Sequence, residues 1–297
     1  MTRLADLAEL VRAPAALSVP GDVLSGAAAA GALGPRTPAL AGASVLLYWA
    51  GMAANDWADR RLDALERPER PIPSGRVRPA VALGVASGLT AAGLAVATAA
   101  GGRRAAAVAL PLAATIWGYD LRAKNTAAGP AVMAACRGLD VLLGASGGRV
   151  VRALPAAITV AAHTWTVTAL SRREVTGADR RLPGLTLAGT ALIALATPAR
   201  PTPPATGRGG SSRAARLGDF VPAVLAAGYA TRYGRAQARV LADPSPGRVR
   251  AAVGAGITGL PALQGALTAR AGARMLGLAV AGAAPLGRRL ARLISPT

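Results

Sequence analysis

The chain has 297 residues, of which 52% are apolar and 16% charged, and its mean hydropathy is +0.38. This composition is too apolar for an ordinary soluble domain and indicates a membrane protein. The net charge of +20 would suit a nucleic-acid binder, but the arginines lie mainly between apolar stretches, where they set topology and face anionic lipid, so no nucleic-acid partner is predicted. One cysteine and one histidine make an intrachain disulfide or a zinc site improbable.

The chain begins with an amphipathic stretch, MTRLADLAELVRAPAAL, which lacks the order of a cleavable signal peptide and is expected to be retained. Apolar windows follow, and roughly 20 helical residues cross about 30 Å of hydrocarbon. We therefore predict an all-α fold, a multispanning transmembrane bundle of about nine or ten helices. The predicted windows are 14–33, 39–54, 79–100, 105–120, 131–148, 154–171, 182–197, 217–231, 250–269 and 273–290.

Along the chain, short connectors between the predicted windows alternate with longer ones that carry most of the charged residues. The positive-inside rule places the charged connectors and the N-terminus in the cytoplasm, in a multi-pass protein of the plasma membrane. A Pro-, Gly- and Ser-rich segment, 198–216, is predicted to be a flexible connector within a single membrane domain, 1–297. The charged connectors lie near 55–78, 121–129, 172–181 and 232–249.

The first charged connector reads NDWADRRLDALERPERPIPSG from 55 to 75. Asn55, Asp59 and Asp63 are spaced i, i+4, i+8, so they share one face of a helix, with Asp56 one step round. Stacked acids repel one another unless cations lie between them. Carboxylate and amide oxygens suit Mg²⁺, which typically completes its shell with water and substrate phosphate oxygens.

Arginines follow the acids, among them Arg67 and Arg70, and the prolines and glycine of RPIPSG end the helix. Arginine is the planar, bidentate partner of phosphate. Acids for a metal and arginines for phosphate at a membrane edge indicate a site for a diphosphate attached to a lipid. A solvated loop of mixed charge is the alternative, and the acid spacing and the Pro-rich exit argue against it.

This stretch resembles the first aspartate-rich motif of the UbiA superfamily of intramembrane prenyltransferases, NDxxDxxxD followed by RPIPSG, placed after the second span. The resemblance implies a helical bundle around a central cavity, in which Mg²⁺ joins aspartates to a prenyl diphosphate and an acceptor captures an allylic cation. It also implies that Asn55, Asp59 and Asp63 bind metal and diphosphate, that Asp56 is an auxiliary acid, and that Arg67 and Arg70 are diphosphate partners.

Two later segments extend the resemblance. In YDLRAKNTAAG, Tyr119 and Lys124 are similar to a Tyr and a Lys that many family members have there, although Lys124 is open to being an ordinary basic loop residue. Within the fifth predicted span, Arg137 and Asp140 are i, i+3 and are expected to form an ion pair. That pair is expected either on the cavity wall or in a structural role.

The family's second acidic motif is altered in SRREVTGADRR. Glu174 and Gly177 match the first acid and the glycine, but Asp179 comes one residue late, a shift of about 100° on a helix. Four readings stay open: a loop geometry that restores Asp179, a second metal held by Glu174 and water, a diphosphate held by Arg172 and Arg173, or lost catalysis. This segment is more similar to the divergent EboC-like branch than to quinone-forming members.

The predicted site combines these segments, and His163 is predicted to be a packed or cavity-lining residue rather than a general base. The predicted catalytic residues are Asp59, Asp63 and Glu174. The predicted metal ligands are Asn55, Asp56, Asp59, Asp63, Glu174 and Asp179. The predicted diphosphate contacts are Arg67, Arg70, Tyr119, Lys124, Arg137 and Arg173.

The predicted function is Mg²⁺-dependent transfer of a prenyl group from a polyprenyl diphosphate to a hydrophobic acceptor, aromatic or lipid-like, within membrane lipid. A non-catalytic relative that binds a lipid or assists metabolite export is the rival from another class. A CDP-alcohol phosphotransferase also uses Mg²⁺ and spaced aspartates, but it needs an Asp-Gly and Ala-Arg pattern that the acidic stretch lacks.

Overall fold

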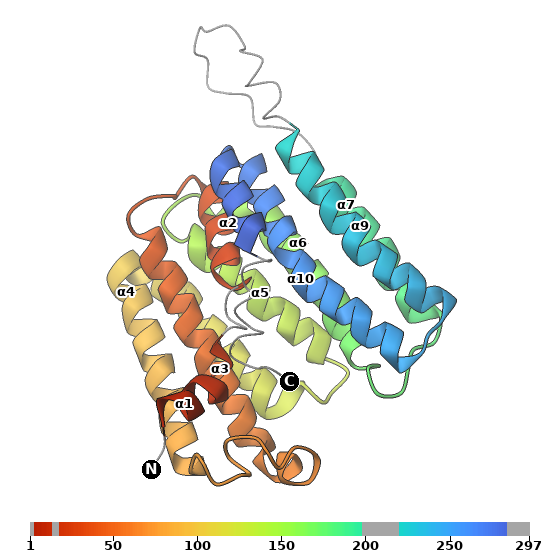
Figure 1. Cartoon of the computed structure of the whole chain (residues 1–297). Coiled ribbons are helices and arrows are strands. Elements are labelled where there is room, and N and C mark those ends of the chain that lie inside the picture. The colour runs from red at the N-terminus through yellow and green to blue at the C-terminus, as the bar shows by residue number, and fades with distance from the viewer. Residues whose placement is uncertain (1–2, 14–17, 198–219, 284–297) are drawn as a thin grey trace, which may run out of the picture.

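The computed structural model describes residues 3–13, 18–197 and 220–283, and all regular structure in those ranges is helical (Figure 1). This confirms the all-α prediction. The connector predicted at 198–216 lies outside the described residues. The helices are α1 (Leu4–Leu10), α2 (Pro20–Ala30), α3 (Thr37–Glu66), α4 (Pro79–Gly118), the π-helical turn η2 (Tyr119–Ala123), α5 (Gly129–Ala145), α6 (Val150–Ser171), α7 (Arg181–Ala196), α9 (Val221–Ala242), α10 (Pro246–Arg270) and a last segment, Arg274–Ala283.

Helix α4 is two helical segments that fold back on each other at Gly102. This glycine has φ 62° and ψ −154°, a conformation that strongly favours glycine. The indole N–H of Trp117 donates to the hydroxyl of Thr90 at 3.0 Å, although 27 residues of straight helix would separate them by about 40 Å. The reversal therefore gives two antiparallel segments where the sequence predicts two separate spans.

Three helical stretches among the described residues are long and apolar enough to cross a membrane: Thr37–Glu66, Pro79–Ala123 and Val150–Ser171. The shorter helices α5 and α7 and the arginine-bearing α9 and α10 complete the bundle. Large apolar side chains are exposed on its outer faces, among them Leu110, Ile158 and Leu195. Such exposure is expected where a helical surface faces lipid instead of water.

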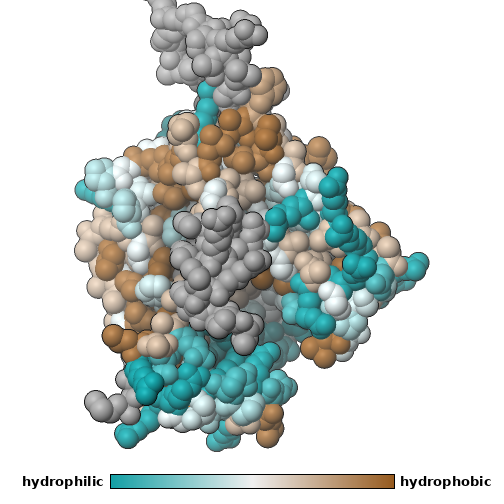
Figure 2. All heavy atoms as spheres, in the orientation of Figure 1, coloured by the Kyte–Doolittle hydropathy of each residue, from teal (hydrophilic) through white to brown (hydrophobic). Residues whose placement is uncertain are grey.

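Hydrophilic side chains gather in two places on the face shown in Figure 2. One patch lies at the bottom of the view, over the end of α3 and the turn that follows it. The other runs along the right-hand edge, over α9 and the start of α10. The rest of the coloured surface in this view is largely apolar, so charge is confined to a few regions of the bundle.

Helices α2 and α5 cross in backbone contact because each has a glycine at the crossing point. A Cβ atom on Gly26 would overlap the carbonyl oxygen of Val141, and one on Gly144 would overlap that of Val23. Small residues at such crossings let membrane helices approach closely. The contact fixes α2 against α5, which in turn lies beside α3, α4 and α6.

Substituting Gly144 with alanine is expected to lower the apparent melting temperature of the purified protein markedly. Overpacking typically costs about 1–3 kcal/mol, and here the obstacle is backbone, which cannot rotate away. Gly42→Ala on α3 is the matched control, because nothing lies within 4 Å of the position that a Cβ atom would take there. Equal melting temperatures for the two variants would contradict the close crossing.

The N-terminal helix α1 lies over the turn that follows α3. The guanidinium of Arg76 binds carboxylate oxygens of Glu9 at 2.6 Å and Asp6 at 3.0 Å. Leu10 is fully buried in a cluster with Ile72, Val77 and alanines of α3 and α4. The charges of this amphipathic stretch thus attach it to the mouth of the bundle, beside the acidic motif.

Candidate active site

Helix α3 carries the acidic motif as a continuation of a membrane-spanning helix. It extends through Glu66, and Arg67 and Pro68 end it, since proline disfavours a helical conformation of the preceding residue. Asn55, Asp59 and Asp63 therefore lie on successive turns of one face, as the spacing predicts. The scaffold is regular, so the positions of these side chains follow from helix geometry.

Arginines from two other segments contact the buried acids of the motif. A guanidinium nitrogen of Arg12 lies 2.6 Å from a carboxylate oxygen of Asp56. Arg70 bridges two acids, at 2.7 Å from Asp63 and 3.5 Å from Asp56. Arg67 lies 3.9 Å from Asp63 and is half exposed. The RPIPSG turn thus folds back so that Arg70, its first residue, faces the acids.

Lys124 forms an ion pair with the central acid of the motif. Its ammonium nitrogen is 2.6 Å from a carboxylate oxygen of Asp59, and both side chains are largely buried. The π-helical turn η2 positions it, since a π-helix shifts the residues that follow relative to a regular α-helix. The same turn brings Asp120 to Asn55, whose amide donates to the Asp120 carboxylate at 3.1 Å. The sole lysine of the chain is therefore a partner of the acidic motif.

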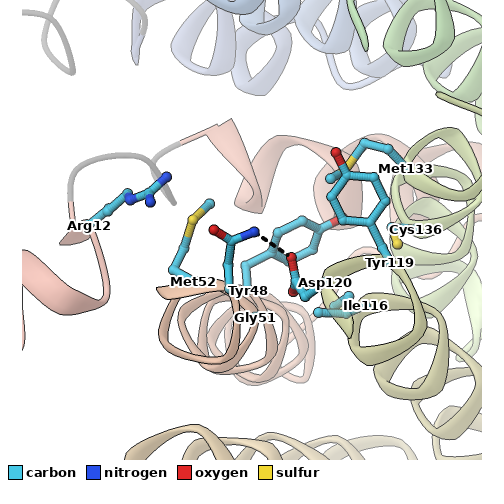
Figure 3. Close-up of a pocket in the computed structure, with 10 residues that line it drawn as sticks. Arg12, Tyr48, Gly51, Met52, Ile116, Tyr119, Asp120, Met133 and Cys136 are labelled. Atoms are coloured by element: carbon cyan, nitrogen blue, oxygen red, sulfur yellow. Dashed lines mark hydrogen bonds between the residues drawn. The ribbon is translucent and has the colours of Figure 1, made fainter. Parts of the chain in front are cut away.

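A cavity of about 220 Å³ lies beside these ion pairs, between α3, the end of α4 and α5 (Figure 3). Arg12 and Met52 lie at one end, Tyr119, Met133 and Cys136 at the other, and Asp120 between them. The lining combines apolar side chains with a few polar groups, as ligand sites generally do. The lining residues are Arg12, Tyr48, Gly51, Met52, Asn55, Ile116, Tyr119, Asp120, Met133 and Cys136.

The altered second motif forms a loop and not a continuation of its helix. Helix α6 ends at Ser171, and Gly177 has φ 78°, so the predicted rotation of Asp179 about a helix does not apply. Asp179 instead accepts a hydrogen bond from the backbone N–H of Leu182 at 2.9 Å, in the first turn of α7. It is exposed and serves as a cap for that helix.

The remaining residues of this loop make separate contacts. Partial burial raises the pKa of Glu174, and the charge of Arg250 opposes that shift. The guanidinium of Arg172 donates to the carbonyl oxygens of Lys124 and Thr126. The loop therefore touches the segment that carries Lys124 through Arg172, whereas Arg173 is exposed.

Arg137 pairs with a different acid from the one predicted. Its guanidinium lies 2.8 Å from a carboxylate oxygen of Asp22 on α2, and Asp140 accepts a hydrogen bond from Ser44 at 2.5 Å. The expectation of an Arg137–Asp140 ion pair is wrong because α2 crosses closely enough to bring its own acid to the guanidinium. Arg137 is buried and does not line the cavity. Its guanidinium lies over the ring of Tyr48, which does line the cavity.

His163 is fully buried in contact with two tyrosines of α9. Its Nδ1 lies 2.9 Å from the hydroxyl of Tyr229, and its ring meets those of Tyr229 and Tyr233 edge-on. It does not line the cavity beside the acidic motif. The prediction of a packed histidine agrees with this position.

Comparison with known proteins places the chain in a family. The model of the UbiA prenyltransferase family matches residues 21–197, more than half of the chain. The chain belongs to the UbiA prenyltransferase family. This membership and the apolar helices identify an integral membrane protein.

Two curated relatives of this UbiA-family protein are digeranylgeranylglyceryl phosphate synthases. The one from Natronomonas pharaonis is 45% identical over 85 residues, which are 28% of this chain and 31% of the relative. The one from Methanothrix thermoacetophila is 42% identical over 80 residues, 26% and 30% of the two chains. The chain thus matches less than a third of the length of these relatives.

Solved structures share the fold of this UbiA-family protein over nearly its whole length. A structure from a study of digeranylgeranylglyceryl phosphate synthase in membranes has a TM-score of 0.66 at 16% identity and covers 91% of this chain and 99% of its own. A UbiA homologue from Aeropyrum pernix K1, solved in its apo form, has a TM-score of 0.62 at 18% identity, over 88% and 96%. At these identities the likeness concerns the fold alone.

The predicted metal-ligand set is not gathered in one place. Within the described ranges, no three His, Cys, Asp or Glu side chains are close enough to hold a metal ion. Each acid of the first motif is paired with a basic side chain, and Asp179 caps α7. The donors of the UbiA motif are nevertheless all oxygens, which is the chemistry that Mg²⁺ prefers when substrate phosphates complete its shell.

Sequence reasoning missed two residues beside the UbiA motif, Arg12 and Asp120. Arg12 comes from the segment after α1, 44 residues from its partner Asp56. Asp120 directly follows Tyr119, but its side chain faces α3 only because the chain enters a π-helical turn there. The charged N-terminal stretch was the available signal for Arg12. No signal in the sequence marked the turn.

The two acids of the altered motif are expected to differ in effect. If Glu174 supports a second metal, Glu174→Gln should raise the Mg²⁺ concentration needed for half-maximal turnover. Asp179→Asn should leave that concentration unchanged, because Asp179 is engaged at the start of α7. Titrating Mg²⁺ in a diphosphate-release assay measures both variants. Negligible effects from both would remove the loop from the site.

Proposed function

We propose that the protein transfers a prenyl group from a polyprenyl diphosphate to a hydrophobic acceptor, with Mg²⁺. The ion pair between Asp59 and Lys124 carries the proposal, because it joins the acidic motif to the segment after α4. Asn55 and Asp120, from the same two segments, line the cavity. An acid suited to a metal and a lysine suited to a phosphate are thereby held in contact. The family membership supports the same reaction class.

The basic residues bind the diphosphate in this proposal. Lys124 and Arg70 exchange their carboxylate partners for phosphate oxygens, and Arg12 is close enough to Asp56 and the cavity to do the same. Asn55, Asp56, Asp59 and Asp63 would then be the oxygen donors for Mg²⁺. When bound, that ion neutralises charge that develops on the leaving diphosphate.

The cavity is proposed to hold the reacting carbon away from water. The bond between the first prenyl carbon and the diphosphate oxygen breaks, and its electron pair leaves with the diphosphate. The acceptor supplies an electron pair to that carbon and loses a proton. Asp120 lines the cavity and is the carboxylate placed to accept this proton. Tyr48 and Tyr119 present aromatic rings there, which favour a nearby cation.

A lipid-like acceptor is the finer proposal. The names of the curated relatives specify a prenylated glyceryl phosphate, which is a lipid. Because the matched segments cover only part of each relative, this substrate class is proposed here and an aromatic acceptor is the alternative. A non-catalytic lipid-binding role is the second candidate function, and the engagement of Asp179 at α7 favours it.

Location and organisation complete the proposal. We place the protein in the plasma membrane with the acidic motif, Lys124 and the 172–180 loop on the cytoplasmic side. The concentration of arginines in those connectors supports that orientation. The whole chain, 1–297, is proposed to form one membrane domain.

The direct test is release of labelled diphosphate from prenyl diphosphates of several chain lengths by the purified protein in lipid. Release that requires Mg²⁺ and increases when a glyceryl phosphate lipid is added would support the proposal. If the release of diphosphate increased only with an aromatic compound, the acceptor would be aromatic and the proposal of a lipid-like acceptor would be wrong. No release at any chain length, from protein that binds the diphosphate, would support the non-catalytic role.

A further inference from the structure

A second recess lies away from the candidate active site, in the outer groove between α9 and α10. Its volume is about 610 Å³. Four arginines line it, Arg232, Arg235 and Arg239 on α9 and Arg248 on α10, and no acidic side chain is among its lining residues. The hydrophilic region along the right-hand edge of Figure 2 lies over α9 and the start of α10, the helices that carry these arginines.

The arginines of α9 form a row. Their spacing of three and four residues puts them on one face, over roughly 10 Å of helix axis. Arg232 donates to the hydroxyl of Thr258 at 3.1 Å, and Arg248 lies 3.4 Å from Asp243. Arg235 and Arg239 have no side-chain partner in the described part of the chain. Two of the three guanidinium groups of this row are therefore uncompensated.

The same face of α9 becomes apolar along its length. Beyond Arg232 it continues through Gly228 and Ala227 to Val224, which is exposed. The floor of the groove on α10 consists of Ala251 and Ala255. Small side chains leave the recess open, so the groove presents phosphate-binding groups at one end and an apolar channel at the other.

The basic end of the groove lies on the same side of the bundle as the acidic motif. The turn between α9 and α10 accepts a hydrogen bond at Pro244 from the N–H of Ala178, in the loop after α6. That loop contacts the carbonyl of Lys124 through Arg172, and Lys124 contacts Asp59. In the orientation proposed above, with the acidic motif on the cytoplasmic side, the arginines would lie at the level of the lipid headgroups and the apolar end of the groove would lie within the hydrocarbon.

We propose that this groove binds an anionic phospholipid. The phosphodiester lies between Arg235 and Arg239, which bind its oxygens through their paired N–H groups. One acyl chain follows the alanine and glycine floor toward Val224. The lipid is a resident of the outer surface, distinct from any substrate in the cavity beside Asp59.

The test uses the purified full chain in mixed micelles with a fluorescent phosphatidylglycerol, followed by polarisation. Unlabelled phosphatidylglycerol should displace the probe at least about tenfold better than phosphatidylcholine. Both lipids carry the phosphodiester, but only phosphatidylglycerol keeps a net negative charge, whereas the choline cation of phosphatidylcholine is repelled by the arginines. Glycerol 3-phosphate, which has the phosphate but no chains, should compete far more weakly. Equal competition by glycerol 3-phosphate would indicate a site for free phosphate esters and overturn the lipid proposal.

The double variant Arg235→Gln/Arg239→Gln should weaken probe binding by about tenfold or more. Arg180→Gln/Arg181→Gln is the matched control, because it removes the same charge from exposed arginines on the same side and outside the groove. Equal losses of probe binding in the two variants would mean that the anionic lipid is attracted by the net positive charge of the protein, and would contradict a specific site in the groove. The melting temperature of Arg235→Gln/Arg239→Gln in the same micelles should equal that of wild type, so that a loss of probe binding does not come from unfolding.

Saturating prenyl diphosphate should not displace the probe, and Asp59→Asn should bind the probe like wild type. Those two results test the groove independently of the proposed enzymatic function. The lipid proposal can hold if the protein is not an enzyme, and the enzymatic function can hold if the groove binds no lipid. Displacement of the probe by prenyl diphosphate would place the lipid in the cavity and overturn the proposal.

Discussion

Replacing Asp59 with asparagine is expected to reduce Mg²⁺-dependent release of diphosphate by at least about 100-fold, the scale of losing an electrostatic contact to a transition state. The substitution keeps the size of the side chain but removes the charge that pairs with Lys124 at 2.6 Å and that would bind the metal. Lys124 loses its partner as well. The measurement is the initial rate of release from a labelled prenyl diphosphate at saturating Mg²⁺.

Glu66→Gln is the matched control for this experiment. Glu66 is the last residue of the same helix, is exposed and makes no ion pair with any other described residue. Its rate should stay within about twofold of wild type, as is usual for surface substitutions. If the Asp59→Asn variant retained the wild-type rate, the central acid would be excluded from catalysis, and only a role in binding would remain for it.

Replacing Arg137 with glutamine is expected to produce the largest loss of stability. Arg137 and its partner Asp22 are both buried, and breaking such a pair from one side typically costs about 3–5 kcal/mol because a buried charge is left without compensation. Asp22 also accepts a hydrogen bond from Gln264 at 2.6 Å, so the loss extends to α10. The readout is the melting temperature in detergent.

The double variant Asp22→Asn/Arg137→Gln should recover part of that stability, since no unpaired charge remains between these two positions. Arg152→Gln, an exposed position on α6, supplies the control for loss of one arginine charge. Strictly additive effects of the two single substitutions would show that the pair has no energetic coupling, in contradiction to the observed contact.

The acidic motif was predictable because its information is local. Asn55, Asp59 and Asp63 share a face through helix periodicity alone, and α3 preserves that periodicity through Glu66. The helical class was equally predictable, since apolar windows of membrane length leave few other structures possible. The two spans joined at Gly102 were visible as two windows for the same reason.

The partners of the motif were less predictable because they arrive from distant segments. Arg12 and Asp120 reach α3 through the packing of α1 and through a π-helical turn. The error at Arg137 has the same origin. Its i, i+3 neighbour Asp140 is visible in the sequence, whereas Asp22 becomes a partner only because two glycines let α2 approach α5.

The loop at 172–180 shows a different limit. A helical rotation argument assumed that α6 continues past Ser171, but the helix ends there and Asp179 turns to the first N–H groups of α7. Capping by aspartate is a local preference that the sequence SRREVTGADRR contains. Whether Asp179 caps a helix or binds a metal depends on where α6 ends, and the sequence alone does not show that end.

The pairing of Asp56, Asp59 and Asp63 with Arg12, Arg70 and Lys124 makes the resting site nearly neutral. If a diphosphate bound alone, the basic side chains would pair with it and the three carboxylates would lose their partners. If a divalent ion bound alone, the carboxylates would bind it and the basic side chains would lose theirs. Each ligand therefore removes the penalty that the other meets. Their affinities must be reciprocally coupled, so that each binds more tightly in the presence of the other.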